Sequence, residues 1–121
     1  MLYMFMENGF EETEALATLD FIRRAGIEIK MVSDHEIIEG SHGIKVLRDL
    51  SFEETTKDNL EGIILPGGQP GSDNLKANKK VREFIDYALD NKLLVSAICA
   101  APYILGEMGV LEGVCATSYP D

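Results

Sequence analysis

The sequence predicts a single α/β domain with a mainly parallel sheet. Short apolar runs alternate along the chain with longer segments of helical periodicity, which is the pattern of parallel strands joined by crossover helices. The chain has 121 residues, and two domains of half that size would each bury too little surface to be stable. It contains no internal repeat, low-complexity tract or linker-like stretch. We therefore expect one domain over residues 1–121.

The composition narrows the class of partner. Hydrophobic residues make up 45% of the chain and charged residues 26%, as in ordinary soluble globular proteins. Acidic residues number 21 against 11 basic ones, so the formal net charge is −10. Because this charge repels phosphate backbones and anionic lipid, we expect neither nucleic acid nor a membrane as a partner.

The first element is expected to be a buried strand over Leu2–Met6. This apolar run has no basic segment before it and is too short for a signal peptide or a membrane-spanning helix. Cys99 and Cys115 are the only cysteines. Without an export signal, we expect both to be reduced thiols in the cytoplasm.

A helix is predicted over about Glu11–Ala25. Its apolar residues recur at helical spacing, acids occupy its first turn, bases occupy its last turn, and Gly26 follows it. These features all favour a helix with these ends. The residues concerned are Leu16, Leu19 and Ile22 on the apolar stripe, Glu11, Glu12 and Glu14 in the first turn, and Arg23 and Arg24 in the last turn.

The remaining elements follow from the same rules. Short apolar runs predict strands, a four-residue turn rich in glycine predicts a hairpin, and apolar residues at i, i+3, i+4 and i+7 predict a second long helix. The run Leu93–Ala97 is typical of a central strand covered on both faces. In chain order the elements are the strand Ile27–Val32, the hairpin strands Glu36–Ile38 and Ile44–Leu47, the strand Gly62–Leu65, the helix Lys79–Asn91, the strand Leu93–Ala97, a short helix after Cys99 to about Met108, and the strand Val114–Thr117.

Three loops are expected to meet at the carboxyl edge of this sheet, where open parallel sheets bind ligands. They follow the strands Leu2–Met6, Gly62–Leu65 and Leu93–Ala97. In the last loop, Cys99 lies on a sharp strand-to-helix turn with small neighbours, which is the arrangement of a nucleophile elbow. A helix N-terminus at this point would stabilise the thiolate. The alternative is that Cys99 is a small buried hydrophobic residue, as free cysteines usually are.

Two further groups at this edge could support a nucleophile. Gly67 and Gly68 can present backbone N–H groups to an oxyanion, because glycine lets the backbone approach a ligand closely. The alternative for them is a plain turn. Glu14, one turn into the first helix, can share or donate a proton with the thiol. The alternative, a solvated acid at a helix start, suits Glu11 and Glu12 and stays open for Glu14.

Six segments together resemble the ThiJ/PfpI superfamily, in the branch of the Parkinson-linked protein deglycase. They occur in the order of the family and span nearly the whole chain, so the ordered set is specific although each segment alone is weak. The segments are Gly9-Phe-Glu-Glu-Thr-Glu-Ala15, Arg23-Arg-Ala-Gly-Ile27, Gly40-Ser-His-Gly-Ile44, Ile63-Ile-Leu-Pro-Gly-Gly68, Ala97-Ile-Cys-Ala-Ala-Pro102 and Ala116-Thr-Ser-Tyr-Pro120.

The resemblance implies a flavodoxin-like three-layer α/β/α sandwich that usually forms homodimers. By position, Cys99 matches the reactive cysteine of the family and Glu14 matches its partner carboxylate. The oxyanion-binding groups of the family are matched by Gly67, Gly68 and the backbone of Ala100.

Histidines are where the chain departs from its relatives. The protease-like branch has histidine directly after the cysteine, where this chain has Ala100, and many relatives have histidine where this chain has Tyr119. The only histidines here are His35 and His42, so a Cys–His dyad within one subunit is not expected, which argues against a peptidase.

The turn with His42 matches one that reaches the neighbouring subunit's site in relatives; the alternative is an exposed turn residue. Tyr119 is either a ligand contact or a structural tyrosine.

Relatives continue past the position of Asp121 with further strand and helix, including a glycine-rich segment near the site. We therefore expect the fold without these C-terminal elements, with apolar sheet surface left uncovered. Whether the sequence is a piece of a longer chain or a natural short form stays open.

The leading functional hypothesis is a cysteine-dependent enzyme of the deglycase or glyoxalase type. In it, Cys99 attacks a reactive carbonyl such as that of methylglyoxal, or a glycated substrate, and forms a hemithioacetal, while Glu14 moves protons. The alternative is a redox sensor or holdase-type stress protein without turnover, since an accessible thiolate oxidises readily. A cysteine peptidase or amidase is the third hypothesis. We expect no cofactor, and the separated histidines and cysteines predict no metal site.

Overall fold

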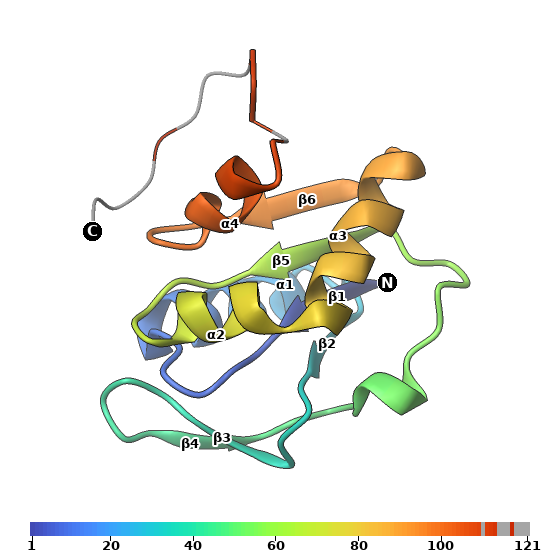
Figure 1. The fold of residues 1–121 in the computed structure, drawn as a ribbon. Helices are drawn as coiled ribbons and strands as arrows, with labels where there is room; N and C mark the ends of the chain where they lie inside the picture. Colours follow the sequence, from blue (N-terminus) through green and yellow to red (C-terminus); the bar gives the residue numbers. More distant parts are fainter. Residues whose placement is uncertain (110, 114–116, 118–121) are drawn as a thin grey trace.

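The computed structural model describes residues 1–109, 111–113 and 117. Its centre is a four-stranded sheet in the order β2–β1–β5–β6 (Figure 1). All the pairings within this sheet are parallel, so the carboxyl ends of the strands lie at one edge. The predicted parallel sheet is thereby confirmed. Its strands are β1 Leu2–Phe5, β2 Ile29–Val32, β5 Gly62–Leu65 and β6 Leu94–Ala97.

Helices cover both faces of this sheet and give the expected three layers (Figure 1). The helix α1, Glu12–Arg24, packs on one face, and α2, Gly71–Ala77, and α3, Lys79–Asp90, pack on the other. The short helix α4, Pro102–Glu107, follows β6. Among the residues described, no helix has the length and apolarity that a membrane crossing requires.

The alternation of side chains along β1 divides the core into two clusters. Tyr3 and Phe5 point to the side of α3, where Tyr3 meets the ring of Phe84 edge-on at a centroid distance of 5.9 Å. Leu2 and Met4 point to the side of α1. Because successive residues of a strand face opposite sides, β1 is buried on both faces, as a central strand should be.

The helix α1 begins and ends where the local sequence predicts. Glu11 is its N-cap, and the Glu11 carboxylate accepts hydrogen bonds from the N–H groups of Thr13 and Glu14, both at 3.1 Å. Gly26 follows the helix with a φ of +79°, a left-handed conformation that glycine adopts without a Cβ penalty. The prediction of this helix is confirmed.

The predicted hairpin is also confirmed, as β3, Ile37–Glu39, paired antiparallel with β4, Lys45–Leu47. Two helical segments are found that the sequence patterns do not predict, the 3₁₀ turn η1, Phe52–Glu54, and the helix α2. The residues that open α2 are typical of turns. This helix buries Leu75 in the core, so tertiary packing supplies what local propensity does not.

The position of β6 differs from the prediction. In the described part of the chain no strand pairs with its outer side, so β6 is an edge strand and the expectation of a central strand covered on both faces is wrong there. Leu94 is 55% exposed and Ile98 is 49% exposed. This uncovered apolar surface agrees with the expectation for a fold without its C-terminal elements. The strand predicted over Val114–Thr117 lies, apart from Thr117, outside the described residues.

Candidate active site

Three loops meet at the carboxyl edge of the sheet, as the sequence predicts. The loop after β1 is joined to the loop after β5 by a hydrogen bond from the N–H of Glu11 to the carbonyl of Gly67, at 2.9 Å. The loop after β6 is joined to β5 by a bond from the N–H of Ile98 to the carbonyl of Leu65, at 3.3 Å. These bonds bring the predicted nucleophile and the predicted carboxylate to one place.

Cys99 lies on a strained turn between β6 and α4. Its φ is +60°, in the left-handed region that residues other than glycine rarely adopt. Strain of this kind clusters at functional sites. The residue is partly exposed, which argues against Cys99 as a fully buried hydrophobic residue. The helix α4 begins only at Pro102, so the thiol lies before the helix and not in its first turn.

Gly67 is the residue on which Glu14 and Cys99 converge. A Cβ built on Gly67 would collide with the Glu14 Oε1 atom and would lie 2.6 Å from the Cβ of Cys99 and 2.9 Å from the carbonyl oxygen of Ile98. Glycine is required here for space, because any side chain would push the carboxylate and the thiol apart. The structure therefore places the predicted partner carboxylate beside the predicted nucleophile.

The pKa of the Cys99 thiol is raised above its ordinary value, opposite to the expectation of a stabilised thiolate. Burial is the largest cause, because it disfavours the charged form. The hydrogen bond to Glu14 and the negative charge of that carboxylate act in the same direction, and the charge of Glu11 adds to them. A hydrogen bond from the backbone of Ala100 favours the thiolate but does not outweigh these effects. The thiol is therefore protonated at neutral pH.

The glycines expected to bind an oxyanion have different surroundings. The N–H of Gly67 donates to Glu14 Oε1 at 3.1 Å, so in this structure it orients the carboxylate. Gly68 has a φ of +108°, and a Cβ there would lie 2.6 Å from the carbonyl oxygen of Gly9. The N–H of Gly68 meets no acceptor within the described residues. Of the two N–H groups, that of Gly67 is thus occupied by Glu14, and an oxyanion-binding role for Gly68 stays a prediction.

Glu12 departs from the expectation of a solvated acid at a helix start. It is only 5% exposed, and its carboxylate accepts the N–H groups of His42 at 2.7 Å and Ile44 at 3.2 Å. Burial alone would raise the pKa of Glu12, but hydrogen bonds from the His42 ring and from backbone N–H groups lower it to about 2. The signal in the sequence is a polar turn, Gly40-Ser-His-Gly-Ile44, whose N–H groups need an acceptor.

His42 lies in the turn between β3 and β4, and its side chain is 74% exposed. Its Nδ1 is 2.9 Å from Glu12 Oε1, and this hydrogen bond together with the charge of Glu12 raises the pKa of His42. Within one chain His42 therefore binds the helix α1 and is not a base for Cys99. Its match to a turn that reaches a neighbouring subunit stays an expectation.

One group of side chains in the described residues has donor atoms close enough to share an ion. Atoms of Glu11, Glu12 and His42 lie within 4.8 Å of one another. Both oxygens of the Glu12 carboxylate, however, already accept hydrogen bonds from the His42 turn. An ion would have to displace these bonds, so the group is better explained as the anchor of the hairpin.

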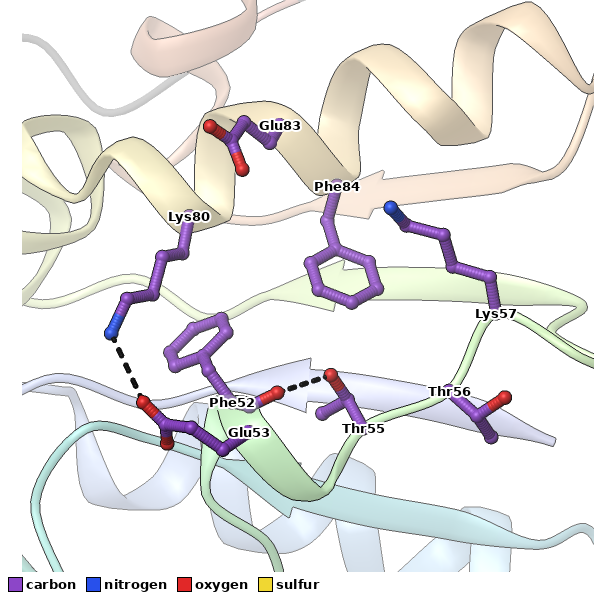
Figure 2. A pocket seen from close by; sticks show the side chains of 8 residues that line it. All are labelled: Phe52, Glu53, Thr55, Thr56, Lys57, Lys80, Glu83 and Phe84. Atoms are coloured by element: carbon purple, nitrogen blue, oxygen red, sulfur yellow. Dashed lines mark hydrogen bonds and ion pairs between the residues drawn. The ribbon is translucent and has the colours of Figure 1, made fainter.

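A separate hollow of about 370 Å³ lies between η1 and α3 and contains none of the predicted site residues. Figure 2 shows its two lysines beside aromatic rings, with the Nζ of Lys80 also 3.8 Å from Glu53. Lys57 lies 5.4 Å from the centre of the Phe84 ring, and Lys80 lies at the same distance from that of Phe52. The cations of this hollow are thus already engaged with the protein. Its lining residues are Phe52, Glu53, Thr55, Thr56, Lys57, Lys80, Glu83 and Phe84.

The site candidate Tyr119 and the second cysteine, Cys115, lie outside the described residues. Sequence reasoning gave Glu11 no part in the site. In the structure Glu11 caps α1, binds the Gly67 loop through its N–H and acts on the thiol through its charge. Glu11 directly precedes a helix whose first turn contains Glu12 and Glu14, and this position could have identified Glu11 as the N-cap.

The chain is similar in sequence to a known protein family and to several of its members. The DJ-1/PfpI family matches residues 1–121 of the chain. The chain is 33% identical over 114 residues to the protein dj-1beta of Drosophila melanogaster, covering 93% of this chain and 61% of that protein. A deglycase of Pyrococcus abyssi is 34% identical, with coverage of 92% and 67%, and deglycase PfpI of Pyrococcus furiosus is 33% identical, with coverage of 93% and 68%. The chain thus spans about two thirds of the length of these relatives.

Solved structures agree with the flavodoxin-like arrangement. The oxidised DJ-1 of Toxoplasma gondii superposes with a TM-score of 0.92 at 30% identity, over 98% of this chain and 66% of that one. DJ-1beta of Drosophila melanogaster superposes with a TM-score of 0.84 at 30% identity, over 90% and 60%. With the whole sequence matched, the layers superposed and a cysteine on the expected turn, the chain belongs to the DJ-1/PfpI family.

Proposed function

We propose that this chain is a cysteine-dependent enzyme of the deglycase or glyoxalase type, acting on reactive carbonyls such as methylglyoxal or on glycated substrates. The names of the two archaeal deglycases support the class of reaction. The observation that carries the proposal is the meeting of the Cys99 thiol and the Glu14 carboxylate at Gly67. A homodimer and a cytoplasmic location belong to the same proposal, and sedimentation velocity tests the dimer.

The first step is addition of the Cys99 sulfur to the carbonyl carbon. As the S–C bond forms, Glu14 accepts the thiol proton, and the π electrons of the C=O bond move to the oxygen. The N–H of Gly68 donates to this oxygen while its charge develops. Glu14 then returns the proton to the oxygen, so the product is a neutral hemithioacetal and no atom or electron is left over.

A raised thiol pKa suits this role of Glu14. A thiol that is protonated at rest needs a base at the moment of attack, and a positioned carboxylate supplies one. The hydrogen bond between the Cys99 thiol and Glu14 provides the path for that proton. The resting state keeps little thiolate, which limits side reactions with other electrophiles.

The test is consumption of methylglyoxal by the purified 121-residue chain, compared with an equal concentration of a free thiol. We expect turnover above the free thiol, loss of turnover in Cys99→Ser, and a fall of roughly 100-fold in Glu14→Gln, the usual contribution of a general base. Glu28 is exposed and lies directly before β2. Glu28→Gln removes one negative charge, as Glu14→Gln does, and should leave the rate unchanged. A folded chain that is no faster than the free thiol contradicts the proposal.

A redox sensor is the second candidate, and the partial exposure of Cys99 favours it. A solved relative described as oxidised adds to this. The raised thiol pKa weakens the candidate, because the thiolate is the form that peroxide oxidises. Preferential oxidation of Cys99 over Cys115 in peptide mass spectra, without turnover of any carbonyl, would favour the sensor over the enzyme.

A further inference from the structure

We propose that the hollow beside Glu7 binds a small molecule that carries a primary ammonium group. This hollow is separate from the Cys99 turn, so the proposal does not depend on the proposed function. Its volume is about 440 Å³, within the range of small-molecule sites in proteins. The polar side chains that line it belong to Glu7, Asp34, Asn74, Asn78, Lys79 and Lys80.

The hollow lies at the carboxyl edge of the sheet, where open parallel sheets bind ligands. Glu7 comes shortly after β1, and Asp34 comes shortly after β2. The other polar lining residues belong to α2, to α3 or to the junction between them (Figure 1). Three segments that are distant in the sequence therefore converge on this hollow.

Glu7 is the group in this hollow that lacks a partner. It is only 9% exposed, and its Oε1 atom is buried without a hydrogen-bond partner among the described residues. Burial is the largest cause that raises the pKa of Glu7, and it outweighs the opposing hydrogen bond from Asn78 and the nearby positive charges. The terminal torsion of a glutamate is broad, so rotation of the carboxylate presents either oxygen to the hollow. A buried acceptor of this kind gains free energy from a donor that a ligand supplies.

The other charged groups of the hollow are either paired or exposed. The Nζ of Lys80 donates to Asp34 Oδ1 at 2.7 Å, and the Nδ2 of Asn78 donates to Asp34 Oδ2 at 3.1 Å. Lys79 is exposed to solvent. Because Asp34 already holds a cation and an amide, Glu7 is the carboxylate on the lining that is left for a ligand.

The unmet atom is an acceptor, and this decides the class of ligand. The Asn74 side chain donates through Nδ2 to the carbonyl of Asn8 at 2.8 Å, so its amide oxygen is a second acceptor on the lining. A primary ammonium brings three N–H donors, and hydrogen bonds between ionised groups are about twice as strong as neutral ones. An anion would instead meet the carboxylates of Glu7 and Asp34. A quaternary ammonium has the charge but no donor.

The first measurement is thermal unfolding of the 121-residue chain in phosphate buffer, which contains no amine. Ethylammonium chloride is compared with tetramethylammonium chloride and sodium chloride at equal ionic strength. A ligand of three non-hydrogen atoms binds no tighter than about 1 mM. At ten times the dissociation constant of ethylammonium we expect Tm to rise by about 3–6 °C, with no such rise for the other two salts. An equal rise with ethylammonium and tetramethylammonium would overturn the inference.

Variants test whether Glu7 holds the cation. Glu7→Gln keeps the shape of the side chain and removes its charge, so its affinity for ethylammonium should fall at least about tenfold. Glu36→Gln, at an exposed position, removes the same charge from the chain and should keep the full response. Lys79→Gln removes a positive charge from the lining, so it should bind ethylammonium more tightly. An equal response of Glu7→Gln and Glu36→Gln would overturn the inference.

A second measurement locates the bound cation. The side-chain amide signals of Asn74 and Asn78 in proton–nitrogen NMR spectra, assigned with Asn74→Ser and Asn78→Ser, should shift on addition of ethylammonium. We expect these shifts to saturate with the dissociation constant obtained from Tm, and to be absent with tetramethylammonium. A rise in Tm without these shifts would place the cation elsewhere, and neither effect would mean that the hollow holds water only. Either result overturns the inference and leaves the proposed function of Cys99 untouched.

Discussion

The Glu12 carboxylate and the turn residue His42 are joined by two contacts, although they are 30 residues apart in the sequence. The backbone N–H of His42 donates to Glu12 Oε2 at 2.7 Å, and the His42 Nδ1 lies 2.9 Å from Glu12 Oε1. A Cβ on Gly40 would collide with the same carboxylate, so the β3–β4 hairpin is built around it. A single buried acid of α1 thus fixes the hairpin next to the loop that carries the site.

Replacing Glu12 by Gln should destabilise the chain in a pH-dependent way. The folded state lowers the pKa of Glu12 from 4.5 to about 2, so it binds fewer protons there than the unfolded state. The contribution of the carboxylate is therefore complete above pH 4.5 and is lost as the pH falls toward about 2. Thermal unfolding should show a lower Tm for Glu12→Gln at pH 7 and a difference that shrinks on acidification. A difference independent of pH would contradict this.

The pKa of His42 should lie above 6.5 in the folded chain and return toward that value in Glu12→Gln. The bond to Glu12 raises it, so the stabilisation is present below pH 6.5 and is lost as the pH rises through the folded value. Proton NMR titration of the imidazole measures this. The chain has two histidines, and His42→Gln assigns the signal. An unchanged titration in Glu12→Gln would show that the ring is not held by this carboxylate.

Glu7→Gln should stabilise the chain at neutral pH. Glu7 is 9% exposed, and its Oε1 has no hydrogen-bond partner within the described residues. Burial, followed by the charge of Asp34 in the same direction, raises the pKa of Glu7 in spite of opposing effects from His35, Asn78 and Lys80. The folded state therefore binds more protons than the unfolded state, and stability falls as the pH rises above 4.5.

Urea unfolding at several pH values measures the effect of Glu7→Gln. The gain should be largest near pH 7 and should vanish below pH 4.5, where the native carboxyl is protonated in both states. Glu36→Gln, at an exposed position before β3, is the matched control and should change little. A loss of stability in Glu7→Gln at pH 7 would show that the carboxylate has a stabilising partner.

Gly67→Ala should disrupt the site, whereas Gly106→Ala should not. The new Cβ at Gly67 would lie 2.6 Å from the Cβ of Cys99 and would also meet Glu14, and overpacking of this kind costs about 1–3 kcal/mol. A Cβ at Gly106, in α4, would meet nothing within 4 Å, and alanine there should stabilise by up to about 1 kcal/mol. Urea unfolding and the rate of Cys99 alkylation are the measurements. Equal effects of both variants would mean that Gly67 has no special contact.

Cys99→Gly should be more stable than Cys99→Ala, in the reverse of the usual order. At a φ of +60° an L-residue is strained by about 1–2 kcal/mol, and glycine is not. The greater flexibility of glycine in the unfolded chain offsets part of this, so we expect a difference of roughly 1 kcal/mol in the free energy of unfolding. Cys99→Ser should behave as the alanine variant does. If alanine were the more stable, the turn would not hold the strained conformation in solution.

The parts of the fold that the sequence predicts are those set by neighbours along the chain. The cap at Glu11, the bases of the last turn and Gly26 all lie within α1 or beside it, so the helix follows from local patterns. The helix α2 does not, because its opening residues favour a turn and its stability comes from the burial of Leu75. Edge or central position in a sheet, as for β6, depends on which strands are present and not on the strand itself.

In the candidate site, too, some features follow from the local sequence and others depend on contacts between distant segments. Its location follows from the order of strands and the glycine-rich loops, which place Cys99 and Glu14 at one edge. The direction of the thiol pKa does not, because it depends on burial and on which atoms touch the sulfur. Glu11, Glu12 and Glu14 look alike in the sequence, yet one caps a helix, one holds a hairpin and one meets the thiol. Only contacts with distant segments distinguish them.

Among the described residues, the outer side of β6 has no strand paired with it, and this side lies next to the turn that holds Cys99. The N–H and C=O groups on this side, which no described strand pairs, form a template for an extended segment, and exposed Leu94 offers an apolar contact at the start of β6. A fifth strand docked parallel to β6 would end beside Cys99, since β6 leads directly into that turn. Completing the sheet and shielding Cys99 from solvent would then be the same event.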